Sequence, residues 1–164
     1  MPAKEKTLTD LFLETLKDMY HAEKQILKSL PKMAKSAASD QLREAFENHR
    51  NETENQIERL EQVFEMFGKP ARAKTCDAIL GIIEESKEVM EEFRGTEALD
   101  AGLIASAQTI EHYEISRYGT LKTWATQLGM NDAVRLLEQT LQEEKKTDQL
   151  LTQIAESAVN KEAA

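Results

Sequence analysis

Seven residues in four widely separated segments have the chemistry of metal ligands, and each lies where the helical pattern calls for an apolar core side chain. An ionised carboxylate taken out of water costs several kcal/mol, and a folded domain is held by only about 5 to 15 kcal/mol. The pattern places no lysine or arginine on the same helix faces to balance these acids. We therefore predict that cations balance them. The candidate metal ligands are Glu23, His49, Glu52, Glu111, Glu114, Glu144 and Asp148.

The spacing of these residues favours a pair of metal ions. Side chains three residues apart lie on one face of a helix, as Glu111 and Glu114 do, and also His49 and Glu52. Two cations bridged by carboxylates can neutralise four or more acids. Oxygen ligands with one imidazole suit iron or manganese, whereas structural zinc sites prefer thiolates and imidazoles. The expected cofactor is two iron ions, with manganese as the alternative.

Each candidate also has an ordinary interpretation. A single acid on a helix rich in lysine and glutamate is usually solvated or ion-paired, and a lone histidine such as His49 is more often a hydrogen-bonded core residue. On the last long helix both Glu143 and Glu144 are candidates. The face shared with Leu137 and Leu141 favours Glu144. The coincidence of four such segments favours the metal interpretation over the ordinary one.

The composition excludes several classes of protein. A chain of 164 residues that is 31% charged and 40% hydrophobic, with six glycines and three prolines, fits long amphipathic helices and an all-α fold. The net charge of -9 disfavours nucleic acid and anionic membrane surfaces as partners. The single cysteine, Cys76, indicates a reducing compartment. Because the sequence shows neither a signal peptide nor an apolar run of membrane-spanning length, we expect a cytoplasmic protein.

Hydrophobic periodicity predicts a single domain over residues 1–164 with five helices. The core helices are expected at about 8–38, 40–67, 97–128 and 131–159. A shorter helix at about 76–94 has no inward acid, so we expect it to cross over between two helix pairs.

An internal repeat supports this arrangement. The segment Tyr20–Glu23 matches Glu111–Glu114, and each is followed about thirty residues later by another acid-bearing helix. Two helix pairs related by approximate two-fold symmetry would bring the four acidic segments into one central layer.

Four segments that include these residues resemble the YciE/YciF family of bacterial ferritin-like proteins, which are related to rubrerythrin. The resemblance implies a ferritin-like four-helix bundle with a di-metal centre, a link to stress responses, and a small oligomer, expected to be a homodimer. The chain differs from better-studied ferritin-like enzymes because His49 precedes Glu52, the reverse of the usual order, and because the fifth helix has no histidine. The four segments are YHAEKQILKSL (20–30), HRNETENQIERL (49–60), EHYEISRYGTL (111–121) and EEKKTDQL (143–150).

Three functions stay open at this point. The first is a di-iron or di-manganese protein that oxidises ferrous iron with oxygen or peroxide, as a ferroxidase or peroxide-dependent oxidoreductase. The second is a non-catalytic helical dimer that uses or sequesters metal, and the third is a miniature ferritin that stores mineralised iron in a cage. The roles expected are terminal ligand for Glu23 and Glu144, bridging ligand for Glu52 and Glu114, further ligand for His49 and Glu111, and ligand or partner of a ligand for Asp148.

Overall fold

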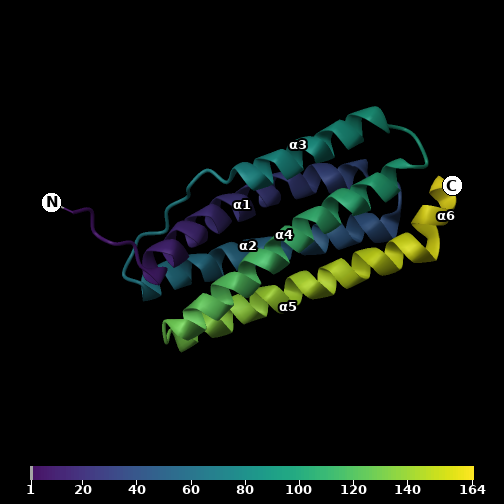
Figure 1. Ribbon diagram of the computed structural model, residues 1–164. Coiled ribbons are helices and arrows are strands. Elements are labelled where there is room, and N and C mark those ends of the chain that lie inside the picture. Colours follow the sequence, from purple (N-terminus) through teal and green to yellow (C-terminus); the bar gives the residue numbers. More distant parts are fainter. Residues whose placement is uncertain (1) are drawn as a thin grey trace.

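The protein is a bundle of long helices (Figure 1), in a computed structural model that describes residues 2–164. No β-strand occurs among these residues, and none of their helices is both long and apolar enough to cross a bilayer. The all-α class and the four-helix bundle with an added crossover helix are therefore confirmed. The elements are α1 (Leu8–Ser36), α2 (Asp40–Met66), α3 (Asp77–Glu92), α4 (Leu99–Gln127), α5 (Asn131–Ile154), a π-helical turn (Ala155–Val159) and α6 (Asn160–Ala163).

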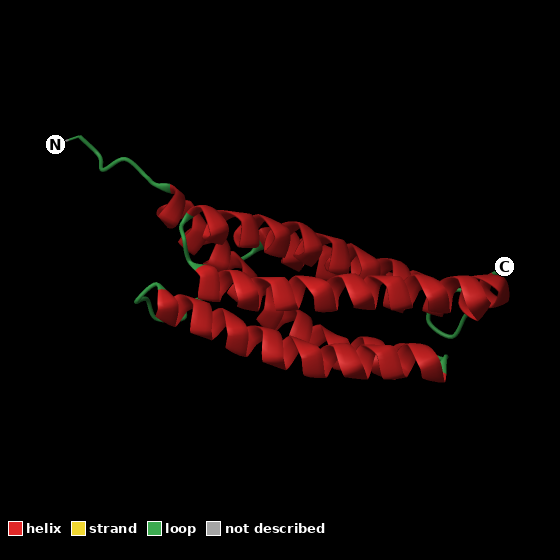
Figure 2. Ribbon diagram, turned by 90° about the horizontal axis from the view of Figure 1, so that it is seen from below, coloured by secondary structure: helices red, strands yellow, loops and turns green. Residues whose placement is uncertain are grey.

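The four long helices form two hairpins that pack against each other. Helix α1 pairs with α2, and α4 pairs with α5. Across the bundle, α2 contacts α5 and α1 contacts α4, while α3 lies along α1 and α4 in the connection between the hairpins. The view in Figure 2 shows the same elongated bundle with the connecting loops gathered at its two ends. The middle turns of all four long helices consequently face one common axis.

Local sequence signals set most of the helix ends. The Thr7 side chain accepts a hydrogen bond from the backbone N–H of Asp10, whose carboxylate in turn accepts from the Thr7 backbone N–H at 2.8 Å. Gly129 closes α4 at φ +72°, a left-handed conformation that strains residues with a Cβ atom. Several helix ends differ from the prediction by one or two residues, as where α1 stops at Ser36. The largest difference is in the last long helix, which gives way after Ile154 to the π-helical turn.

Asp100, in the first turn of α4, joins the two hairpins. Its carboxylate is buried and accepts backbone hydrogen bonds from Ala38 at 2.9 Å and Ser39 at 2.8 Å, both in the loop between α1 and α2. These bonds fix the end of one hairpin against the beginning of the other. They therefore help to hold the relative positions of the helices that supply the central layer.

Replacing Asp100 with alanine should lower the free energy of unfolding by about 2 kcal/mol, because a hydrogen bond to a charged group contributes roughly 1.5 to 3 kcal/mol. Asp100→Asn keeps one acceptor oxygen and should cost less. Urea unfolding of the three proteins would measure both differences. If Asp100→Ala unfolds at the wild-type urea concentration, these two bonds do not stabilise the junction.

Candidate metal centre

Four buried side chains from three helices meet at the centre of the bundle. His49 of α2, Glu111 and Glu114 of α4, and Glu144 of α5 each offer one ligand atom, and these atoms all lie within 4.8 Å of one another. The three glutamates have no exposed surface, and His49 is 2% exposed. Glu111 and Glu114 meet the others from one helix because they are one turn apart on the same face.

Glu23 brings α1, the fourth long helix, to the same layer. Its side chain is fully buried, and its Oε1 accepts a hydrogen bond of 2.6 Å from the hydroxyl of Tyr118 on α4. Its Oε2 has no hydrogen-bond partner among residues 2–164. The charges of Glu144 and His49 both act on this carboxylate. We call Glu23, His49, Glu111, Glu114 and Glu144 the central group.

Burial strongly perturbs the titration of the central group. It raises the pKa of Glu23 to about 7, and the charge of Glu144 adds to this effect. Burial and the charge of Glu144 also raise the pKa values of Glu111 and Glu114 well above the usual value. Burial opposes ionisation of Glu144 too, but its contacts with Glu111 and His49 outweigh burial and lower its pKa to about 2. Without a cation, bound protons therefore replace the missing positive charge.

Most polar atoms of the central group have no hydrogen-bond partner. Both carboxylate oxygens of Glu111, Glu114 and Glu144 lack one within residues 2–164, and so does Nε2 of His49. His49 Nδ1 lies 3.1 Å from Oε1 of Glu111, and His49 Nε2 lies 3.7 Å from Oε2 of Glu144, but neither contact has hydrogen-bond geometry. A buried polar atom left without a partner costs about 1 to 3 kcal/mol. A metal ion is one partner that all these atoms could share.

The types of donor atom in the central group suit particular metals. Its four carboxylates and one imidazole provide hard oxygen ligands with a single nitrogen, a set that iron and manganese accept. Among the residues that the structure describes, the only ion-pair partner of these carboxylates is His49. The residues therefore could hold a metal ion, and the number of ions stays a prediction from the sequence.

Glu52 and Asp148 lie beside the central group rather than within it. Glu52 is half-buried, and its Oε2 accepts a hydrogen bond of 3.3 Å from the Thr147 hydroxyl at the seam between α2 and α5. The Asp148 side chain is 21% exposed, and its Oδ2 lies 3.0 Å from Nε2 of His112 at the seam between α4 and α5. The two acids thus flank the central group on either side of α5.

The side chains of Glu143 and Glu144 lie in different environments. Glu144 is fully buried in the central group. Glu143 instead forms a two-pronged ion pair with Arg59 of α2, accepting from the two guanidinium nitrogens at 2.6 and 3.0 Å. Gln56 also donates a hydrogen bond to Glu143 at 3.3 Å. Glu144 is therefore the better candidate ligand, as the shared helix face predicted.

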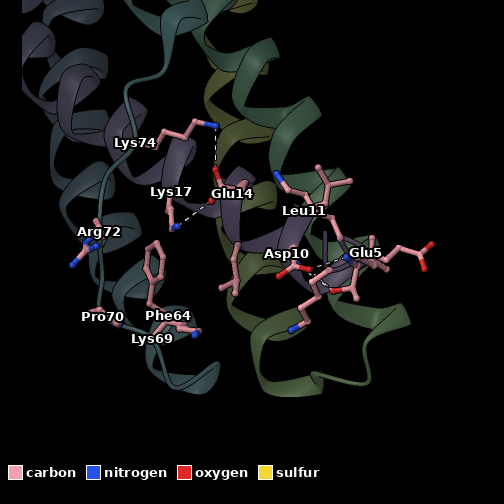
Figure 3. Close-up of a pocket in the computed structure, with 15 residues that line it drawn as sticks. Glu5, Asp10, Leu11, Glu14, Lys17, Phe64, Lys69, Pro70, Arg72 and Lys74 are labelled. Atoms are coloured by element: carbon pink, nitrogen blue, oxygen red, sulfur yellow. Dashed lines mark hydrogen bonds and ion pairs between the residues drawn. The ribbon is translucent and has the colours of Figure 1, made fainter. Parts of the chain in front are cut away.

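A hollow on the surface is lined by residues outside the central group (Figure 3). Its lining comes from residues 4–17, 64 and 69–74, at the beginning of α1 and in the connector after α2. Within it, Glu14 accepts from Lys17 at 3.0 Å and from Lys74 at 3.1 Å, so its charge is already paired. None of the central group lines this hollow, which separates it from the metal chemistry.

The fold and the site together define a helical bundle with a buried candidate metal centre. This chain belongs to the family described as "Domain of unknown function (DUF892)", which matches residues 7–164. It is 49% identical over 160 residues to Protein YciF of Escherichia coli (strain K12), with 96% of each chain covered. The resemblance to the YciE/YciF family is thus confirmed.

Solved structures agree with this assignment. The crystal structure of the E. coli stress protein YciF matches with a TM-score of 0.91 and 47% identity, over 96% of this chain and 99% of that one. YcfI from Rhodopseudomonas palustris matches with a TM-score of 0.88 and 44% identity, over 93% and 97% of the two chains. A protein from Xanthomonas campestris shares the fold, with a TM-score of 0.74 at 20% identity and 94% of each chain covered.

Proposed function

We propose that this protein binds two iron or manganese ions in the central group and oxidises ferrous iron with oxygen or hydrogen peroxide. The observation that carries the proposal is the set of six buried oxygens on Glu111, Glu114 and Glu144 that lack hydrogen-bond partners within residues 2–164. When ionised, the four glutamates of the group carry four negative charges, which two divalent cations would balance.

The residues of this chain would hold such ions in specific ways. His49 offers its unpartnered Nε2, and Glu23 offers Oε2 because Tyr118 occupies its other oxygen. Bound iron would supply the electrons that reduce oxygen or peroxide. The buried carboxyls would release their protons when metal binds, because the pKa values of Glu111 and Glu114 are raised. In this proposal Glu52 is a further ligand or the partner of a ligand, whereas Asp148, which pairs with His112, lies outside the resident ligand set.

The relatives add a biological setting to this proposal. The solved E. coli relative is described as a stress protein, and we extend a stress-related role to this chain. Consumption of ferrous iron and an oxidant is a reaction that fits such a role. The homodimer, which the family resemblance implies, and the cytoplasmic location, which the sequence predicts, both stay predictions. Sedimentation would separate a dimer from a ferritin-like cage, which would be far heavier.

Anaerobic loading with ferrous iron, followed by oxygen or peroxide, tests the proposed reaction. The wild-type protein should form ferric iron at least about tenfold faster than Glu114→Gln, which keeps the size of the side chain but loses a charged ligand. Glu88→Gln is the matched control, because Glu88 is exposed on α3. Equal rates in wild type and Glu114→Gln would remove the enzymatic function.

The burial of the central group favours a second candidate, a protein that holds metal without turnover. The exposed fraction of its side chains is at most 2%, so a bound ion would be shielded from solvent and larger molecules. A structural role has been suggested for the R. palustris relative. In the same experiment this function predicts that ferrous iron binds to wild type but is oxidised no faster than in free solution.

A further inference from the structure

We propose that His112 and Asp148 form an uptake site, at which a divalent cation binds near the surface before it moves inward to the central group. This inference rests on the proposed function, because it needs the central group to bind metal. His112 follows Glu111 directly on α4, and Asp148 lies one turn beyond Glu144 on α5. The pair is therefore next to two candidate ligands along the chain.

Of the two side chains, His112 is mostly exposed to solvent and Asp148 is mostly buried. The His112 side chain is 67% exposed and that of Asp148 is 21% exposed, with Nε2 and Oδ2 3.0 Å apart. The other oxygen of Asp148, Oδ1, is buried and accepts no hydrogen bond from the described part of the chain. A single carboxylate thus has one oxygen paired with an exposed imidazole and one oxygen in the interior.

The seam that holds this pair belongs to helices that also supply ligands of the central group. The charge of Asp148 acts on the Glu111 carboxyl, and Glu111 Oε1 lies 3.1 Å from His49 Nδ1. The Gln108 amide donates to the Asp148 backbone carbonyl at 3.3 Å and to the Thr152 hydroxyl at 2.8 Å, which fixes α5 against α4 at this seam. His112 and Asp148 therefore lie at the seam between α4 and α5, the two helices that also carry Glu111, Glu114 and Glu144.

The chemistry of this pair suits transient binding. An imidazole nitrogen and a carboxylate are ligands that first-row divalent cations accept. Two protein ligands bind a cation weakly, and a site that passes an ion onward must bind it weakly enough to release it. A surface ion pair with one partner this exposed adds little to stability, so stabilisation alone is a weak explanation for it.

Uptake of cobalt(II) by the metal-free protein tests the inference, because cobalt bound in the central group absorbs visible light and does not require turnover. Stopped-flow mixing would give the rate of loading and the final absorbance. Asp148→Asn and His112→Gln should each load about tenfold more slowly than wild type and reach the same final absorbance. Glu138→Gln is the matched control, since it removes another ion pair between α4 and α5, that of Glu138 with Lys122, and should load at the wild-type rate.

The possible results separate this inference from the proposed function. If the wild type takes up no cobalt, the proposed function fails, and the uptake site fails with it. If the wild type binds cobalt and Asp148→Asn loads equally fast, only the uptake site is overturned. A lower final absorbance in Asp148→Asn would also overturn it, because Asp148 would then be a resident ligand.

Discussion

Saturating the metal-free protein with manganese should raise its melting temperature by about 10 °C. A ligand that binds only the folded state at roughly a thousand times its dissociation constant stabilises that state by about 4 kcal/mol, and each kcal/mol is worth about 2 to 4 °C at this chain length. The rise is expected because the cations would remove the repulsion among the four buried glutamates of the central group. Calorimetry with and without a chelator measures it.

Glu114→Gln makes this experiment specific to the central group. Burial raises the pKa of Glu114 and so favours its protonated carboxyl in the metal-free protein, and an amide of the same size replaces that carboxyl with little change. The variant should therefore melt near the wild-type temperature when metal-free but lose most of the rise with manganese. Glu88→Gln, at an exposed position on α3, should keep the whole rise. A full rise in Glu114→Gln would exclude Glu114 as a ligand.

The metal-free protein should become less stable as the pH rises from about 4.5 towards neutral and beyond. A carboxyl with a raised pKa in the folded state binds its proton more tightly there than in the unfolded chain. Its contribution to stability is complete below the unfolded pKa and is lost as the pH rises through the folded pKa. For Glu23 this window runs from 4.5 to about 7, a loss of about 3 kcal/mol.

Neighbouring groups change stability in the same direction over this range. The pKa values of Glu111 and Glu114 are raised. Burial lowers the pKa of His49, but Glu144, Glu23 and Glu52 together outweigh burial and raise it, so its contribution is lost only as the pH rises above 6.5. Glu144 has a lowered pKa of about 2, so its own contribution changes only below 4.5. The free energy of unfolding is therefore predicted to fall between pH 4.5 and about 7.

Urea unfolding at about pH 5, 6 and 7.5 would measure this loss in the presence of a chelator. With saturating manganese the fall should disappear, because the cation favours the ionised carboxylates at every pH where it binds. A free energy of unfolding that stays constant or rises with pH in the metal-free protein would show that these carboxyls are not forced to hold protons.

Much of the central group could be predicted from the sequence because burial follows helical periodicity. Glu23 and Glu144 lie at the middle of apolar stripes, and both are fully buried. Glu52 and Asp148 lie in the same pattern but at the margins of the stripes, where they are only partly buried. Because an apolar stripe covers an arc of about 100° or more of a helix, the sequence alone could not separate the two cases.

Contacts between helices were less accessible to sequence reasoning. The hydrogen bond from Tyr118 to Glu23 depends on how α1 packs against α4. The sequence indicates only that Tyr118 lies about one turn from Glu114 on the same helix. Asp100 gave no signal, since an acid in the first turn of a helix is already explained by the helix dipole. Its bonds to the loop between α1 and α2 exist only in the folded structure. Helix ends such as Thr7 and Gly129 were predictable because their signals are local.

The most direct test counts the metal ions bound per chain. Wild type and Glu114→Gln would be dialysed to equilibrium against the same free concentration of ferrous iron without oxygen, and elemental analysis would follow. The central group should bind about two ions per wild-type chain, and fewer in the variant. A wild-type protein that binds none, or a variant that binds as many as the wild type, would contradict the proposal that the buried glutamates are held together by metal.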